Sequence, residues 1–315
     1  MRIALSDFLC TSVSKKEFPI QSSYRRLREK KGAEMKASER KLWLTFLVVG
    51  MASILGSSGS SQTRIPEVHY EPTPQLIVEE LLKMAEVNQN DILYDLGCGD
   101  GRFVITAAKK YGARGVGIDI DPQRIKESVQ NAYISGVTDK VKFIEGDLFD
   151  MDIREATLVS LFLLPELNLQ LRPRLLKDLK PGSRVVSHEF DMADWQPDKM
   201  GRMGRNKYYF WVVPTDVAGQ WSWSLSSARG EENFTLSLVQ KFQEIDGKIT
   251  TPIQTVSALE AYLIGNQIGF LLRYRPSGKT VEMRYRGQVS ENTIKGTVEV
   301  NAGPYAGKHK WVAKR

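Results

Sequence analysis

The sequence contains little cysteine and little histidine. Of its 315 residues, two are cysteines, Cys10 and Cys98, and three are histidines, His69, His188 and His309. One pair of cysteines does not make a disulfide framework, and we expect Cys98 to be a small packing residue. No histidine lies close to a cysteine in the sequence, so the ligand spacing that zinc sites use is missing and no metal site is predicted.

A dense basic region is missing from the middle of the chain. The formal charge of +7 is unevenly distributed, because residues 1–41 hold 11 basic and 5 acidic side chains and residues 216–315 hold 13 and 9. Residues 42–215 hold 20 basic and 23 acidic side chains, a charge of −3. Proteins that bind nucleic acids normally present a concentrated basic surface. The charge pattern therefore disfavours a nucleic-acid substrate and suits a basic protein substrate.

Long hydrophobic runs are also scarce. The apolar run of residues 42–55 is short for a membrane span; a basic stretch beginning at Met35 precedes it, and a Gly/Ser-rich segment follows. This order is typical of a signal peptide, although the uncharged residues 42–63 also suit a membrane anchor. We therefore expect residues 35–63 to be a signal-like or anchoring segment with a linker, and the protein to be membrane-associated or exported. Residues 1–34 are expected to be a disordered basic extension.

A glycine-rich turn in the middle of the chain connects an apolar strand to a helix. Residues 91–101 read Asp-Ile-Leu-Tyr-Asp-Leu-Gly-Cys-Gly-Asp-Gly, and a helical pattern over residues 102–111 follows at once. This order opens a nucleotide-binding α/β unit. Gly97, Gly99 and Gly101 lack a Cβ atom, so a ligand can lie against the backbone, although glycines in such turns also serve tight packing alone. No Lys-Ser/Thr pair follows the turn, which excludes a P-loop.

Acidic residues stand at the ends of three successive strand patterns. Asp95 precedes the first glycine, Asp119 ends the strand of residues 115–118, and Asp147 follows the strand of residues 141–145. Ligands of parallel sheets bind at the carboxyl ends of the strands, where a carboxylate on the second strand can accept hydrogen bonds from the hydroxyl groups of a ribose. A carboxylate after the third strand can accept a hydrogen bond from the amino group of an adenine. The pattern therefore predicts a site for an adenosine-containing ligand.

These motifs resemble those of a known family. Asp-Leu-Gly-Cys-Gly-Asp-Gly, Gly-Ile-Asp and Gly-Asp are similar to the cofactor site of class I S-adenosylmethionine-dependent methyltransferases. Tyr-Glu-Pro-Thr-Pro at residues 70–74 and Arg-Val-Val-Ser-His-Glu-Phe at residues 184–190 resemble the archaeal protein-lysine methyltransferases most closely. They resemble more distantly the mitochondrial enzymes that methylate lysines of the ATP synthase c subunit and the adenine nucleotide translocase. The resemblance implies that S-adenosylmethionine is the cofactor and that a lysine ε-amine accepts the methyl group.

The motifs also give a set of candidate site residues. For the cofactor they are Asp95, Gly97, Gly99, Gly101, Asp119 and Asp147. A lysine ammonium must lose a proton before it can accept a methyl group, by desolvation or with a nearby carboxylate. Glu189 and His188, after the fifth strand, are candidates for orienting and deprotonating it, and Tyr70 for an aromatic wall. Each of the three can instead have a structural role. Glu189 can cap a turn, His188 can be a partly buried histidine with its hydrogen bonds satisfied, and Tyr70 can pack the following helix onto the domain.

The order of the patterns predicts the fold. For residues 64–215 we expect a doubly wound, Rossmann-like sheet of the class I methyltransferase type, in which residues 208–213 form an antiparallel edge strand. Helices are expected over residues 74–87, 102–111, 122–135 and 167–179, with Thr73 and Asp121 as N-caps. Over residues 216–315, period-two segments between turn signals predict an antiparallel β meander that closes toward a barrel or sandwich. Its alternating aromatic residues are expected to form a core.

Two other functions are compatible with the sequence. A small-molecule methyltransferase would use the β domain to select its substrate. A non-catalytic, exported scaffold would explain the apolar N-terminal run, but it would have no need for the intact glycines and strand-end carboxylates. Fold similarity alone does not decide among these functions.

Overall fold

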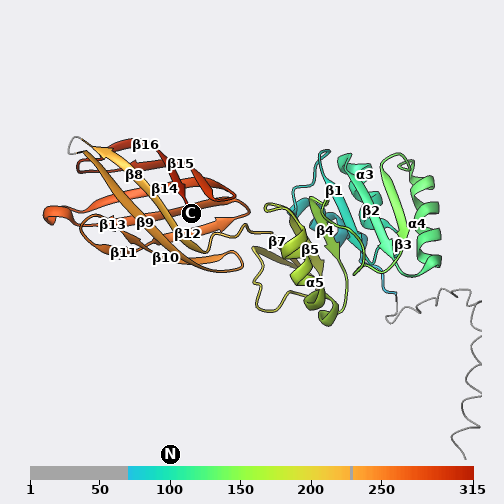
Figure 1. Cartoon of the computed structure of the whole chain (residues 1–315). Coiled ribbons are helices and arrows are strands. Elements are labelled where there is room, and N and C mark those ends of the chain that lie inside the picture. The colour runs from blue at the N-terminus through green and yellow to red at the C-terminus, as the bar shows by residue number, and fades with distance from the viewer. Residues whose placement is uncertain (1–69, 228–229) are drawn as a thin grey trace, which may run out of the picture. The chain divides into compact units, whose positions relative to one another are not determined.

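The computed structural model describes residues 70–227 and 230–315. These residues form two separate β-sheets, one of seven strands with helices and one of nine strands (Figure 1). The predictions for residues 1–63 lie outside the described residues. Within the described part, no helix is long and apolar enough to cross a membrane.

The seven-stranded sheet has the predicted doubly wound topology. Its strands stand in the order β3-β2-β1-β4-β5-β7-β6, and all neighbours from β3 to β5 are parallel, whereas β7 and β6 run antiparallel. The strands are β1 (Ile92–Leu96), β2 (Arg114–Asp119), β3 (Val141–Glu145), β4 (Leu158–Leu161), β5 (Arg184–His188), β6 (Lys199–Met203) and β7 (Asn206–Val212). The antiparallel edge is therefore confirmed, and it includes β6, which the sequence analysis missed.

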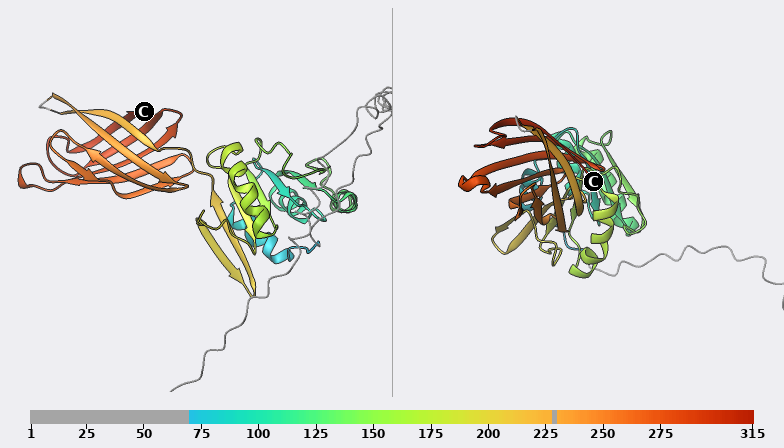
Figure 2. Two further views of the ribbon diagram at one scale, coloured as in Figure 1. Left: turned by 60° about the horizontal axis from the view of Figure 1, so that its bottom comes forward. Right: turned by 60° about the vertical axis from the view of Figure 1, so that its left-hand side comes forward.

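Helices cover both faces of this sheet because successive residues of each strand point to opposite faces. The helices are α2 (Gln75–Met84), α3 (Arg102–Tyr111), α4 (Pro122–Ser135) and α5 (Pro165–Asp178). Leu93 packs with α2 and α3 in one core, and the next residue, Tyr94, belongs to a second core with Leu171 and Leu175 of α5. Figure 2 shows α5 lying against its face of the sheet.

The helix starts show one correct and one wrong N-cap prediction. The Asp121 side chain accepts a hydrogen bond from the backbone N–H of Gln123 and caps α4 as predicted. At α2, however, the N-cap is Pro74, and no side chain caps the helix. The Thr73 hydroxyl lies 3.2 Å from Nδ1 of His188 instead. The hydroxyl that was predicted to cap α2 thus bonds to a residue 115 positions further along the chain.

The nine-stranded sheet is antiparallel throughout, as predicted, and curls into a nearly closed barrel (Figures 1 and 2). Its strands are β8 (Gly219–Ser227), β9 (Gly230–Lys241), β10 (Glu244–Thr250), β11 (Thr255–Ser257), β12 (Leu259–Ile264), β13 (Gln267–Tyr274), β14 (Val281–Ser290), β15 (Thr293–Val300) and β16 (Gly307–Lys314). The order is β11-β10-β9-β8-β16-β15-β14-β13-β12. A hydrogen bond from Ala258 N–H to the carbonyl of Gly247, 2.8 Å long, links the chain before β12 back to β10.

Aromatic side chains fill the interior of the barrel. Trp223 stacks on Phe234 and meets Tyr285 and Trp311 edge-on, with ring centroids 5.3 to 5.8 Å apart. All four side chains are buried. The alternating aromatic residues are therefore core residues, as expected. The proposed division of the chain at residue 215 stays a prediction, although it falls between β7 and β8.

Candidate functional site

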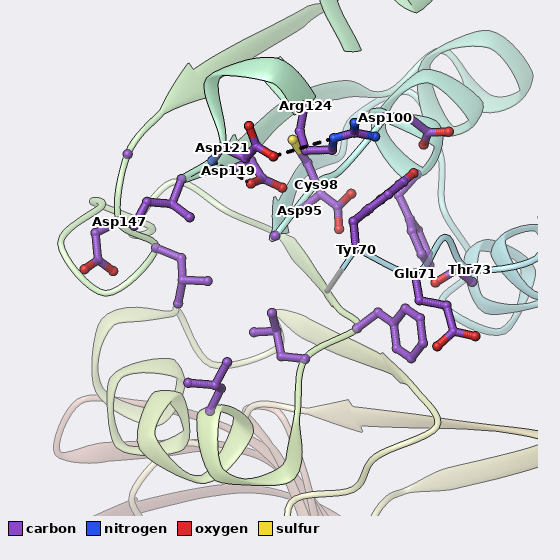
Figure 3. A pocket seen from close by; sticks show the side chains of 18 of the residues that line it. Tyr70, Glu71, Thr73, Asp95, Cys98, Asp100, Asp119, Asp121, Arg124 and Asp147 are labelled. Atoms are coloured by element: carbon purple, nitrogen blue, oxygen red, sulfur yellow. Dashed lines mark hydrogen bonds and ion pairs between the residues drawn. The ribbon is translucent and has the colours of Figure 1, made fainter. Parts of the chain in front are cut away.

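A cavity of about 1060 Å³ opens at the carboxyl ends of the central parallel strands (Figure 3). Asp95 of β1, Asp119 of β2 and Asp147 after β3 all line it. The residues that follow β4, including Phe162 and Leu163, form another part of its wall. The topology therefore brings the three strand-end carboxylates predicted from the sequence into one site.

The three glycines of the turn after β1 have different neighbours. Gly97 lines the cavity with φ +85°, and a Cβ atom there would come within 2.9 Å of the Leu163 side chain. At Gly99, with φ +54°, a Cβ atom would come within 2.3 Å of the Tyr70 ring. At Gly101 it would meet Phe143 and Ser128. Of the three glycines, Gly97 therefore offers its backbone to a ligand, whereas Gly99 and Gly101 make room for side chains.

Asp119 connects the end of β2 to the glycine turn. Its Oδ2 accepts a hydrogen bond of 2.9 Å from the backbone N–H of Gly99, and its Oδ1 accepts one of 3.0 Å from Asp121. The carboxylate is therefore oriented before any ligand binds. Asp147, on the side of the cavity that β3 forms, accepts a hydrogen bond of 2.9 Å from the N–H of Phe149.

Asp95 is a buried carboxyl group at the back of the cavity. Only 4% of its surface is exposed, and its Oδ1 accepts a hydrogen bond of 2.6 Å from the Ser160 hydroxyl on β4. Burial raises the pKa of Asp95 to about 7; the nearby Asp119 and Asp100 also raise it, and the bond from Ser160 opposes the shift. The group therefore changes charge near neutral pH. Ser160 was not identified in the sequence analysis, because only the pairing of β1 with β4 brings it to Asp95.

Residues 70–73 form a wall of the cavity and are held by the chain around the glycine turn. The Tyr70 ring lies against Gly99, and the guanidinium of Arg124 lies 4.6 Å from the ring centroid. Arg102 donates a hydrogen bond of 2.6 Å to the carbonyl of Thr73 and forms an ion pair of 2.5 Å with Asp100. Burial opposes ionisation of Asp100, but its bonds to Arg102 outweigh this effect and the pKa of Asp100 is lowered. Burial, followed by the charge of Asp100, raises the pKa of Tyr70.

His188 is buried beside the cavity and is not among the residues that line it. Its Nε2 lies 3.2 Å from Oδ1 of Asn206, an acceptor, so Nε2 carries the proton and Nδ1 accepts from the Thr73 hydroxyl. Its ring centroid lies 4.2 Å from that of Phe162, which does line the cavity. Burial lowers the pKa of His188, which favours this neutral form. The residue connects the wall of the cavity to β5 and β7.

Glu189 also lies outside the residues that line the cavity. Its backbone has φ +65°, and its Oε2 accepts a hydrogen bond of 3.0 Å from the N–H of Lys207. Its own N–H donates to the carbonyl of Lys207 at 2.8 Å. These bonds close the turn after β5 against β7. The catalytic role expected for Glu189 stays a prediction, and the geometry shows a structural role for its carboxylate.

The lining of the cavity fits a cationic nucleoside ligand. Among residues 70–227 and 230–315, six carboxyl groups and two guanidinium groups line the cavity, and the backbone of Gly97 also lies on its wall. The carboxylates at the ends of β2 and β3 have the places where α/β folds bind ribose and base. These are the features that S-adenosylmethionine requires, because it combines an adenosine with a sulfonium and an ammonium group. In the described residues, no group of three or more His, Cys, Asp or Glu side chains is arranged to hold a metal ion.

Comparison with known proteins agrees with this geometry. Residues 95–199 match the family model of the ANTKMT methyltransferase domain. A protein-lysine N-methyltransferase of Saccharolobus islandicus is 45% identical over 152 residues, which cover 46% of this chain and 94% of that protein. The chain belongs to this methyltransferase family. The resemblance seen in the sequence is therefore confirmed, and S-adenosylmethionine is the cofactor that this methyltransferase site takes.

Two further relatives show the breadth of the similarity. The human lysine N-methyltransferase of the ATP synthase c subunit is 29% identical over 163 residues, which cover 52% of this chain and 64% of that protein. A crystal structure titled RNA methyltransferase from Salinibacter ruber, in complex with S-adenosyl-L-homocysteine, is 50% identical and matches with a TM-score of 0.46. The match covers 47% of this chain and 96% of that chain.

Proposed function

We propose that this methyltransferase transfers the methyl group of S-adenosylmethionine to the ε-amine of lysine residues in proteins. The observation that carries the proposal is the 45% identity with an archaeal protein-lysine N-methyltransferase over 94% of that protein's length. The acidic lining of the cavity supports it, since a lysine substrate is a cation.

The size of the cavity also supports a second substrate beside the cofactor. Pockets that enclose one small ligand measure roughly 300 to 1,000 Å³. The cavity of about 1060 Å³ is slightly larger than that range and is open to solvent, so a side chain of a second protein can enter it. When bound, S-adenosylmethionine supplies an activated methyl group on its sulfonium. The protein has to hold the amine in line with that group and provide a place for the ammonium proton.

We propose roles for the cofactor-binding residues from their places in the cavity. The carboxylate of Asp119 accepts hydrogen bonds from the ribose hydroxyl groups, and that of Asp147 accepts one from the adenine amino group. Gly97 has no side chain, so the ligand can lie against the turn. The carboxyl group of Asp95 lies behind the turn, where its negative charge stabilises the cationic methionine part. Tyr70 holds the glycine turn from the opposite side, in contact with Gly99.

Two parts of the sequence-based interpretation stay predictions. They are the membrane association or export inferred from residues 42–55, and the absence of a nucleic-acid substrate inferred from charge. RNA therefore belongs in the test as a competing substrate.

The test uses tritiated S-adenosylmethionine, the full chain and a cell extract. We expect label in the protein fraction that resists nuclease, with methyllysine identified by mass spectrometry. Label found only in the low-mass fraction would support a small-molecule methyltransferase, and nuclease-sensitive label would support RNA. An Asp119→Asn protein should lose the labelling, whereas Asp139→Asn, which alters an exposed carboxylate away from the cavity, should keep it.

A further inference from the structure

Most carboxyl groups that line the cavity already have a partner within the chain. The lining groups are Glu71, Asp95, Asp100, Asp119, Asp121 and Asp147. Asp119, Asp121 and Asp147 each accept hydrogen bonds from backbone N–H groups, which hold the turns after β2 and β3. Asp100 is paired with Arg102, and Asp95 accepts a hydrogen bond from Ser160.

Glu71 differs from the other five. Among the carboxylates that line the cavity, it alone has no hydrogen bond or ion pair with another side chain or backbone group of residues 70–227 and 230–315. It is exposed to solvent. Figure 3 shows Glu71 and Asp147 on opposite sides of the cavity, so Glu71 lies far from the end that suits the adenine. Because it is exposed and lines the cavity, its carboxylate can be reached by a cation that enters with the second substrate.

The residues on both sides of Glu71 are in contact with other parts of the chain. Tyr70 is held between Gly99 and the guanidinium of Arg124. Thr73 is held through its carbonyl by Arg102 and through its hydroxyl by His188. The backbone of this segment therefore loses little conformational entropy when a ligand binds, and the main ordering cost is that of the Glu71 side chain.

We propose that Glu71 binds the lysine ammonium of the protein substrate and so selects a cationic amine. The inference rests on the proposed function and adds to it the residue that recognises the substrate. An ammonium carries three donors and a carboxylate only acceptors, so the pair forms charge-assisted hydrogen bonds. The acidic mouth of the cavity draws the ammonium in, and Glu71 keeps it beside the site of methyl transfer. Glu71 is thus a specificity-determining residue.

The test compares Glu71→Gln with the wild-type full chain. Glutamine keeps the size of the side chain and removes its charge. The rate of methyl transfer from tritiated S-adenosylmethionine is measured against increasing amounts of the protein fraction of a cell extract, and cofactor affinity is measured separately by calorimetry. We expect the apparent KM for protein to rise about tenfold or more, since hydrogen bonds to charged groups are among the strong ones. The kcat and the cofactor Kd should stay within about twofold of the wild-type values.

Two further measurements separate recognition from a structural effect. Raising the salt concentration should raise the KM of the wild type more than that of Glu71→Gln, because an accessible ion pair is screened. Glu71→Asp should restore part of the affinity. The matched control is Glu80→Gln on α2, which removes a half-buried carboxylate 3.8 Å from Lys83 and away from the cavity, and should change nothing.

The possible outcomes distinguish this inference from the proposed function. If the wild type labels protein lysines and Glu71→Gln has the same KM, the role of Glu71 is wrong and the proposed function stands. A parallel loss of cofactor affinity in Glu71→Gln would show that Glu71 binds the cofactor's own ammonium group, which also overturns the inference. If the wild type labels no protein, the proposed function fails, and the role of Glu71 fails with it.

Discussion

The ring of Tyr70 lies directly on Gly99, so that a Cβ atom at position 99 would come within 2.3 Å of the Tyr70 ring. The two residues are far apart in the sequence, yet the glycine is the reason that the aromatic ring can close one side of the cofactor turn. The backbone N–H of Gly99 also donates a hydrogen bond to the carboxylate of Asp119. One residue of the turn therefore connects the wall of the cavity to the carboxylate that is to hold the ribose.

Gly99→Ala should weaken cofactor binding about tenfold or more, because the added methyl group displaces Tyr70 and shifts the turn. The substitution also costs about 1–2 kcal/mol in the left-handed region that residue 99 occupies. Gly136→Ala is the matched control, since Gly136 has φ +70° and nothing within 4 Å of its Cβ position. It should lose similar stability in thermal unfolding while keeping the cofactor Kd. Equal affinity of both variants in calorimetry would show that the contact with Tyr70 is not needed.

Asp119→Asn should reduce cofactor affinity about tenfold to a hundredfold, because an amide has one oxygen for the two backbone N–H groups and none is left for a ribose. Calorimetric titration of S-adenosylmethionine and of S-adenosylhomocysteine into the full chain measures the effect. Asp139→Asn serves as the control. An Asp119→Asn protein that binds both ligands as the wild type does would remove Asp119 from the site.

Cofactor affinity should rise with pH through the titration of Asp95. Its pKa of about 7 in the free protein means that the carboxyl group is mostly protonated at pH 6 and ionised at pH 8. The cationic ligand favours the ionised form, so its Kd should fall about tenfold between these values, with proton release on binding at pH 6. Asp95→Asn should give an affinity that does not change with pH. Titrations in buffers of different ionisation enthalpy count the protons, and an unchanged pH dependence in the variant would contradict the assignment.

The same group affects stability with a definite sign. Folding raises the pKa of Asp95 above its ordinary value of about 3.9, so between that value and about 7 the folded protein binds one more proton than the unfolded chain. The contribution of Asp95 to the free energy of unfolding is therefore greatest at low pH and falls as the pH rises through this window. Chemical unfolding of the ligand-free protein between pH 5 and 8, with Asp95→Asn as reference, tests the sign.

His188 and Thr73 should be coupled energetically. We expect His188→Ala and Thr73→Val each to lower the free energy of unfolding, and the double variant to lose about 1 kcal/mol less than the sum, because each single change removes the same hydrogen bond. Urea unfolding of the four proteins measures the coupling. His309→Ala with Thr73→Val is a control pair without contact, because His309 lies on β16 of the other sheet and bonds to the carbonyl of Tyr305 in the preceding turn. A coupling near zero between His188 and Thr73 would show that the bond contributes nothing.

Glu189→Gln tests the catalytic role expected from the sequence. The amide oxygen can still accept from the N–H of Lys207, so the turn is kept while the charge is lost. From the geometry we expect cofactor affinity and methyl transfer to stay within about twofold of wild type. Loss of methyl transfer with unchanged cofactor affinity would instead support Glu189 as the group that takes the lysine proton.

The sequence was informative where the signal is local. Period-two and helical patterns placed most elements of the first sheet, because burial on alternating or helical faces leaves a trace in consecutive residues. Strand β6 has only exposed and half-buried residues, so no apolar alternation marks it. Thr73 was misassigned for a related reason, since an N-cap is inferred from its neighbours, whereas its partner is His188.

The sequence by itself determined the order of glycine turn and strand-end carboxylates, and with it the family and the cofactor. The motifs are local patterns in the sequence. Because parallel strands joined by helices bring their carboxyl ends to one edge of the sheet, the order of the motifs is enough to place them in one site. Only the tertiary structure decided which groups face the cavity. The contacts of Tyr70 with Gly99 and of Ser160 with Asp95 join segments that are distant in the sequence, and such contacts leave no periodic signal in the chain. The position of Glu71 at the cavity, without a partner among the residues that the structure describes, likewise follows from the packing of its segment.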